Sequence, residues 1–193
     1  MKTYDIISII PARGGSKRLL GKNKHNIWGE PMFLWPLKVA SKLSENCLVC
    51  VSSDDPEILQ IASENGALAH KRSKKLCDDF TYKQEAIRNA AEWLRNSSIF
   101  GELYISLQAN SPSIKSEVLK KGIDKIRENN KDEIFSVDEN LMQNAAFRIF
   151  KGDYVYQKDL STNCGVVICD VPDIHTIEDL KMVEKNYYPD DQI

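Results

Sequence analysis

The feature that most constrains the fold of this chain is a regular alternation of β-rich and helical segments. Short runs rich in Val, Ile, Tyr and Phe alternate with longer stretches in which apolar residues recur every three or four positions. We expect strands at residues 4–12, 47–53, 67–70, 102–108, 133–137 and 165–171, and helices at 31–45, 57–66, 81–97, 116–130 and 176–186. This alternation is typical of an α/β fold with a mostly parallel sheet.

The length and charge of the chain narrow its organisation. With 193 residues it is expected to form a single domain, 1–193, in which residues 138–164 are the least regular part. A net charge of −2 argues against nucleic acid as a partner. No apolar run suits a membrane span and no signal-peptide pattern is visible, so a cytoplasmic location is the expectation.

The five cysteines do not suggest a metal site. Cys47 and Cys50 form a CxxC, but residues three apart in a strand point to opposite faces. No second cysteine or histidine pair completes a zinc set. We therefore expect free thiols.

A basic loop follows the first expected strand. Between Ile6 and Gly29 the chain has no acidic residue, yet it carries five cations, namely Arg13, Lys17, Arg18, Lys22 and Lys24. Gly14 and Gly15 would let the backbone approach a ligand, and consecutive N–H groups in such a turn can bind an anion. These properties suit a polyphosphate. The alternative is a solvated basic loop with turn glycines.

Ligands of open α/β sheets bind beyond the carboxyl ends of the strands. The loops that begin after Ile10, Ser53, His70, Gln108 and Val171 are therefore expected to surround the site. Glu178 and Asp179 resemble a catalytic carboxylate pair, but they fall in the first turn of a helix expected to be capped by Thr176. Compensation of the helix dipole is the expected role of that pair.

The loop sequence PARGGSKRLLGKN matches neither the Walker motif nor the dinucleotide fingerprint. It resembles the signature of the CMP-N-acylneuraminate (CMP-sialic acid) cytidylyltransferase family, which activates acidic sugars with CTP. The segments VSSDD, KRSKKLCDD, LQANSP and DIHTIEDL continue the resemblance in family order, so that it covers most of the chain. The resemblance implies a three-layer α/β/α, Rossmann-like nucleotidyltransferase fold.

Carried over position by position, the resemblance also implies site residues. Catalytic roles fall to Arg13, Lys22 and Asp173. Nucleotide binding falls to Ala12, Arg13, Gly14, Gly15, Lys22, Asn23, Arg72 and Asp79. Substrate binding falls to Gln108, Asn110 and Ser111, with Ala109-Asn110 standing where the family has Pro-Thr.

The family's end motif holds magnesium with two aspartates, and this chain keeps one of them. Asp173 supplies the first carboxylate, and His175 stands in place of the second. Alternating residues of an extended segment face the same way, so both are candidate Mg²⁺ ligands, although magnesium prefers oxygen to imidazole. Either Asp173, water and phosphate oxygens hold the ion, or His175 has another task.

The resemblance implies transfer of CMP from CTP to an acidic sugar, such as sialic acid or a related nonulosonate or 3-deoxy sugar acid, with release of pyrophosphate. The alternatives are a nucleotidyltransferase for another small acceptor and a nucleotide-binding module with a weakened metal site. Residues 138–164 are shorter than the family's substrate and dimerisation region, so a homodimer is possible rather than assured. Within this region Arg148 and Lys158 are candidates to meet a substrate carboxylate.

Overall fold

The computed structural model describes residues 1–78 and 80–187. Its central feature is a seven-stranded sheet in the order β5-β4-β1-β6-β8-β7-β9. The strands are β1 (Lys2–Pro11), β4 (Cys47–Ser53), β5 (Leu68–Lys71), β6 (Ile99–Leu107), β7 (Glu133–Val137), β8 (Gln143–Lys151) and β9 (Cys164–Ile168). Within this sheet β8 runs antiparallel to both of its neighbours, and the other pairs are parallel.

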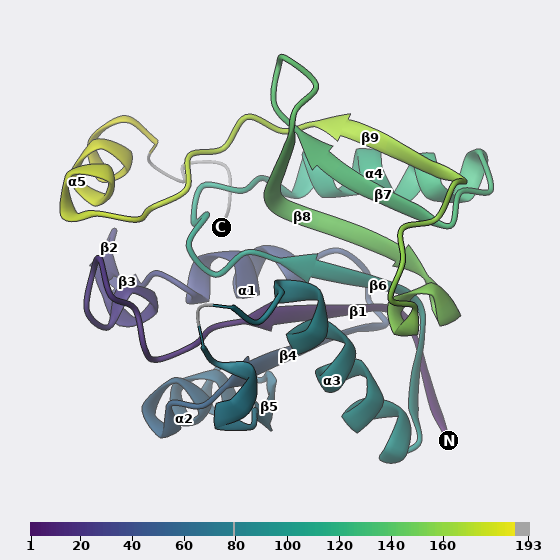
Figure 1. The fold of residues 1–193 in the computed structure, drawn as a ribbon, viewed down its shortest axis with the longest axis horizontal. Coiled ribbons are helices and arrows are strands. Elements are labelled where there is room, and N and C mark those ends of the chain that lie inside the picture. Colours follow the sequence, from purple (N-terminus) through teal and green to yellow (C-terminus); the bar gives the residue numbers. More distant parts are fainter. Residues whose placement is uncertain (79, 188–193) are drawn as a thin grey trace.

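Helices cover both faces of the sheet, as Figure 1 shows. On one face lie α1 (Leu34–Ser41), α2 (Pro56–Glu64) and α4 (Ser116–Glu128), and on the other lies α3 (Lys83–Asn96). Each face has its own buried apolar cluster. The structure thus confirms the three-layer α/β/α architecture. Among the described residues, no helix is both long and apolar enough to traverse a bilayer.

A third apolar cluster lies beside the sheet and fixes the last helix. It joins α5 (Ile177–Asn186) to the small β2–β3 hairpin (Asn26–Ile27 and Glu30–Pro31). Its members are Leu19, Ile27, Met32, Trp35, Ile174, Leu180 and Val183. Packing of this cluster places the segment before α5 against the basic loop, which is where the candidate site forms (Figure 1).

The helix ends follow the expected capping chemistry. The Asp55 carboxylate accepts the N–H of Glu57 at 2.9 Å at the start of α2, with Pro56 in the first turn. Gly66, just after that helix, has a positive φ of 79°. At α5 a complete capping box links Thr176 and Asp179, and Glu178 also lies in the first turn. This confirms the prediction that the two carboxylates stabilise the start of the helix.

Three expectations need correction. Residues 138–164 were expected to be irregular, yet they contain β8 and the 3-10 turn η3 (Gly152–Tyr156). The expected helix at 31–45 is shorter, because Glu30–Pro31 pair in the hairpin before α1 begins. Helical spacing predicts Trp93 on the buried side of α3, but it is 36% exposed and its ring is tilted by 38° to that of His70, with the ring centroids 5.1 Å apart.

The CxxC cysteines lie as the strand period predicts. Cys50 belongs to the apolar cluster under α3, whereas Cys47 packs against the cluster on the opposite face. All five thiols are free. Burial raises the pKa of Cys50 to about 12, as expected for a structural thiol.

Candidate active site

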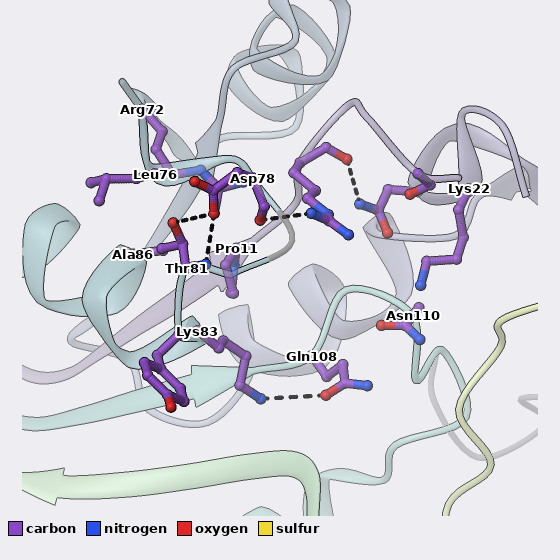
Figure 2. A pocket seen from close by; sticks show the side chains of 14 residues that line it. Pro11, Lys22, Arg72, Leu76, Asp78, Thr81, Lys83, Ala86, Gln108 and Asn110 are labelled. Carbon is purple, nitrogen blue, oxygen red and sulfur yellow. Dashed lines mark hydrogen bonds between the residues drawn. The ribbon is translucent and has the colours of Figure 1, made fainter. Parts of the chain in front are cut away.

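A cavity of about 260 Å³ opens where β1, β5 and β6 end. Its lining comes from the end of β1, the loops that follow these strands and the start of α3, as Figure 2 shows. The lining residues are Pro11, Arg13, Ser16, Lys22, Asn23, Arg72, Leu76, Asp78, Thr81, Tyr82, Lys83, Ala86, Gln108 and Asn110. The cavity therefore lies at the carboxyl ends of the parallel strands, which is where the sequence predicts the ligand site.

The basic loop is fastened to the loop after β4. The Gly14 N–H donates to Asp54 Oδ1 at 3.0 Å, and a Cβ on Gly14 would come within 2.8 Å of the Cβ of Asp55. The Lys24 ammonium lies 2.9 Å from Asp55 Oδ2. Gly14 is thus needed for the contact between two loops, while Gly15 has open space beside it and suits the approach of a ligand.

The Arg13 side chain joins the basic loop to the loop after β5. Its Nη1 donates to the carbonyls of Cys77 at 3.2 Å and Asp78 at 2.9 Å. The Asn23 amide, which is 5% exposed, donates to the Arg13 carbonyl at 2.9 Å. Asn23 therefore fixes the backbone that carries Arg13, and Ala12 beneath it is fully buried and donates its N–H to Ser52.

A second hollow adjoins the first and is lined mainly by cations. Its lining consists of Arg13, Ser16, Lys17, Arg18, Leu19, Lys22 and His175. Burial, and after it the charge of Arg18, lowers the pKa of Lys22. Arg13, Ser16 and Lys22 line both hollows, so an elongated ligand with an anionic end would lie across them.

Arg72 is a buried arginine whose hydrogen-bonding capacity is not fully used by the described residues. It is 6% exposed, and its Nε and Nη2 have no hydrogen-bond partner among the described residues. A buried donor without a partner is costly, and such atoms on a cavity wall point to a ligand acceptor. The position of Arg72 on the wall of the first hollow agrees with the predicted nucleotide contact.

Asn110 and Ser111 hold the end motif in place. Asn110 donates its amide to the Ile174 carbonyl at 2.8 Å and accepts the Ile174 N–H at 3.0 Å. The Ser111 hydroxyl donates to Asp173 Oδ1 at 2.5 Å. Both residues were predicted to bind substrate. The contacts show them positioning the segment that carries Asp173, and Asn110 also lines the cavity.

His175 lies between the Arg18 guanidinium and the Asp173 carboxylate of the end motif. Arg18 Nη2 is 3.0 Å from His175 Nδ1, and His175 Nε2 is 4.0 Å from Asp173 Oδ2. A guanidinium can only donate, so Nδ1 accepts and the neutral ring carries its proton on Nε2, toward Asp173. In this arrangement neither ring nitrogen offers a lone pair to an ion at Asp173.

The donor set fits a magnesium ion that is held mostly by its substrate. Among residues 1–78 and 80–187 there is no cluster of three His, Cys, Asp or Glu side chains that could hold a metal. Magnesium is commonly bound through one or two carboxylates together with phosphate oxygens and water. Asp173 fits the part of the protein carboxylate, and the His175 imidazole fits less well.

Several lining residues were not foreseen from the sequence. Ser16, Thr81, Tyr82 and Ala86 carry no chemistry that singles them out, and Lys83 reads as the first turn of an amphipathic helix. The Lys83 ammonium donates to the Ala145 carbonyl at 2.8 Å and to Gln108 Oε1 at 3.3 Å.

Asp79, which the resemblance assigns to nucleotide binding, lies outside the described residues.

A mostly parallel sheet with a glycine-bearing basic loop over a cavity at its carboxyl edge is the arrangement of a nucleotide-binding α/β enzyme. The profile of one family, described as Cytidylyltransferase, matches residues 7–186, and the chain belongs to that family. This confirms the class of enzyme that the signature indicated.

Two curated relatives show the range of the family. The chain is 32% identical to a pseudaminic acid cytidylyltransferase of Campylobacter jejuni, over 79% of this chain and 67% of that protein. It is 31% identical to N-acylneuraminate cytidylyltransferase A of Danio rerio, over 70% of this chain and 31% of that protein. The chain thus spans about two thirds of the first relative and under a third of the second.

Solved structures confirm the fold. A CMP:2-keto-3-deoxy-manno-octonic acid synthetase complexed with CTP superimposes with a TM-score of 0.71 at 17% identity, covering 93% of this chain and 97% of that chain. A cytidylyltransferase from Leptospira borgpetersenii gives a TM-score of 0.66, also at 17% identity, covering 94% of this chain and 85% of that chain.

Proposed function

We propose that this cytidylyltransferase acts in the cytoplasm and transfers CMP from CTP to an acidic sugar related to sialic acid, with release of pyrophosphate. The observation that carries the proposal is the pair of adjoining hollows that share Arg13 and Lys22. A nucleoside fits the first hollow and its polyphosphate fits the cationic second one. The names of the Campylobacter and fish relatives supply the acceptor class.

The proposed chemistry is an in-line displacement. A hydroxyl oxygen of the acceptor bonds to the α-phosphorus, the bond from that phosphorus to the bridging oxygen breaks, and the hydroxyl proton is released to solvent. Pyrophosphate leaves with added negative charge, which Arg13 and Lys22 are placed to neutralise. The enzyme thus acts by positioning and charge stabilisation, and no covalent nucleophile is required.

Magnesium is part of the proposal as the cofactor, with Asp173 as its protein ligand. When bound, the ion would neutralise phosphate charge in the ground and transition states. The contribution of this chain is to hold the carboxylate still, through the Ser111 hydroxyl on Oδ1 and the two hydrogen bonds between Asn110 and the Ile174 backbone.

A nucleotide-binding module without turnover is the second candidate. The single carboxylate at the end motif and the inward-facing proton of His175 favour it, because they weaken the metal site. This reading predicts that CTP binds but yields no product. Under this hypothesis His175→Asp would create metal-dependent turnover. If the wild type already turns over rapidly, the hypothesis of a binding module is wrong.

The test is pyrophosphate release with each of the four nucleoside triphosphates and a panel of acceptors. The panel holds several nine-carbon and eight-carbon 3-deoxy sugar acids, together with neutral sugars and phosphorylated small molecules. We expect release with CTP, with magnesium and with at least one sugar acid. Release with a phosphorylated or neutral acceptor alone would reassign the acceptor, and no release with any pair would reject the enzyme. Size measurement of the same sample tests the possible homodimer.

A further inference from the structure

A third hollow, of about 340 Å³, lies on the other side of Lys83 from the nucleotide cavity. Its lining consists of Tyr82, Lys83, Gln84, Ser106, Gln143, Asn144, Ala145, Phe147 and Arg148. Tyr82 and Lys83 line both this hollow and the nucleotide cavity, so the Lys83 ammonium lies at their junction. Figure 2 shows Lys83 and Gln108 together along one side of the pocket, with Arg72 and Leu76 along the other.

The hydrogen-bond partners of Lys83 do not neutralise its charge. Its two hydrogen-bond acceptors are neutral oxygens, the Ala145 carbonyl and the Gln108 amide. Among the described residues no ion pair within 4.0 Å involves Lys83, and an ammonium has three protons to donate. A cation in a recess with a spare donor and no counter-ion is suited to an anionic ligand.

The surroundings of Lys83 strengthen this reading. Much of the side chain is exposed, yet loss of hydration around the ammonium lowers the pKa of Lys83 to about 8. The Asp173 charge opposes that shift, and the Arg148 charge adds to it. A bound carboxylate would restore the charge balance at this point.

The other cation of the third hollow is already paired. Arg148 Nε donates to Glu133 Oε2 at 3.0 Å, and the guanidinium lies 4.8 Å from the Phe150 ring centre. Glu133 therefore offsets the Arg148 charge, whereas no carboxylate among the described residues lies within ion-pair distance of Lys83. Of the other cations of the nucleotide cavity, Arg13 and Lys22 lie where it meets the cationic hollow, and Arg72 lies across the cavity from Lys83 (Figure 2).

We propose that Lys83 binds the carboxylate of the acceptor at the junction of the nucleotide cavity and the third hollow, and so selects sugar acids over neutral sugars. The inference rests on the proposed function, because it assigns the acceptor side of the same reaction. Gln108, which accepts from Lys83, fixes the direction of the ammonium. Lys83 is therefore a specificity residue that touches substrate away from the reacting phosphorus.

The first test compares Lys83→Gln with Lys121→Gln, an exposed lysine of α4. Loss of one charge-assisted bond should raise the KM for the sugar acid by about 10-fold or more. The KM for CTP should change by less than about two-fold, since Lys83 has no part in phosphate binding. Lys121→Gln should match the wild type in both constants, and Lys83→Arg should recover part of the loss.

The second test removes the charge from the substrate. With the wild type, the methyl ester of the acceptor should be used about 10-fold or more less efficiently than the acid. With Lys83→Gln, acid and ester should be used almost equally, because the discriminating cation is gone. Equal discrimination in wild type and Lys83→Gln would overturn the inference, as would an unchanged KM for the acid.

The two proposals fail in different ways. If the wild type releases pyrophosphate with a sugar acid and Lys83→Gln does so with the same KM, the assignment of Lys83 is wrong and the proposed function stands. If the wild type turns over no sugar acid, the proposed function fails and the assignment falls with it. Unchanged thermal unfolding of Lys83→Gln and unchanged CTP binding by calorimetry show that the variant is folded.

Discussion

The hydroxyl of Ser111 donates to Asp173 Oδ1 at 2.5 Å, and this bond joins the end of β6 to the segment before α5. The two residues are far apart in sequence, and two hydrogen bonds between Asn110 and the Ile174 backbone join the same two segments. The carboxylate that we assign to magnesium is therefore held by the same loop that contributes Gln108 to the cavity.

Removing the Ser111 hydroxyl tests this unit. Ser111→Ala loses a hydrogen bond to a charged acceptor, which is worth about 1.5–3 kcal/mol, so kcat/KM should fall by roughly 10-fold or more. The magnesium concentration for half-maximal rate should rise, because Asp173 becomes less ordered. The matched control is Ser113→Ala, whose buried hydroxyl has no partner among the described residues. If both variants behave alike, Ser111 does not position the carboxylate.

Gly14 offers a test of the contact between the two loops. A methyl group at Gly14 would lie 2.8 Å from the Asp55 Cβ, whereas one at Gly15 would meet nothing within 4 Å. Overpacking of this kind costs about 1–3 kcal/mol, so Gly14→Ala should lower the free energy of unfolding by that amount. Gly15→Ala should change it by less than about 1 kcal/mol. Urea denaturation measures both, and equal losses would contradict the packing account.

Arg72 should show opposite effects on binding and on stability. Arg72→Met removes two buried donor atoms, Nε and Nη2, that have no partner within the described part of the chain, so the melting temperature should stay the same or rise. CTP should bind about 10-fold or more weaker, because the ligand acceptor loses its charged partner. Calorimetry and thermal unfolding measure the two quantities. Unfolding at a clearly lower temperature, with CTP affinity unchanged, would mean that Arg72 is a structural residue.

His70 should make stability depend on pH. The ring is 4% exposed and bonded to the Ser52 hydroxyl at 3.0 Å, and burial, with a smaller contribution from Arg72, lowers the pKa of His70 from 6.5 to about 4. The unfolded chain therefore takes up a proton at higher pH than the folded chain. The neutral ring contributes about 3 kcal/mol to the free energy of unfolding above about pH 6.5, and this contribution is lost as the pH falls toward 4.

The measurement for His70 is urea denaturation of the wild type and of His70→Gln across pH 4 to 7. Carboxylates elsewhere in the protein titrate in the same range, so the difference in stability between the two proteins isolates the contribution of His70. The variant should lose less stability on acidification than the wild type. Parallel curves would show that His70 does not contribute to acid sensitivity.

Local sequence chemistry was enough to predict the sheet edge and the basic loop. The alternation of strands and helices, the Asp55–Pro56 start and the Thr176 cap each rest on interactions within a few residues, and the structure confirms them. The pairing of Ser111 with Asp173 depends on how distant segments pack. Such pairing has no local signal, so it could not be read from the chain.

The antiparallel β8 and the role of Lys83 were missed for related reasons. The strand begins with Gln143 and Asn144 and continues through two alanines, all poor strand formers, and its order comes from burial between β6 and β7. Lys83 becomes informative only when that strand brings the Ala145 carbonyl beside it. The missed strand thus concealed the residues to which we assign the acceptor carboxylate.

The most direct test of the central claim is identification of the product. The purified chain would be incubated with CTP, magnesium and a sialic-acid-type sugar acid, and analysed by mass spectrometry and phosphorus NMR. The account predicts a compound with the mass of the sugar acid joined to CMP, a single phosphodiester phosphorus and an equimolar amount of pyrophosphate. Intact CTP with every sugar acid tried, or pyrophosphate without a CMP-linked acid, would contradict it.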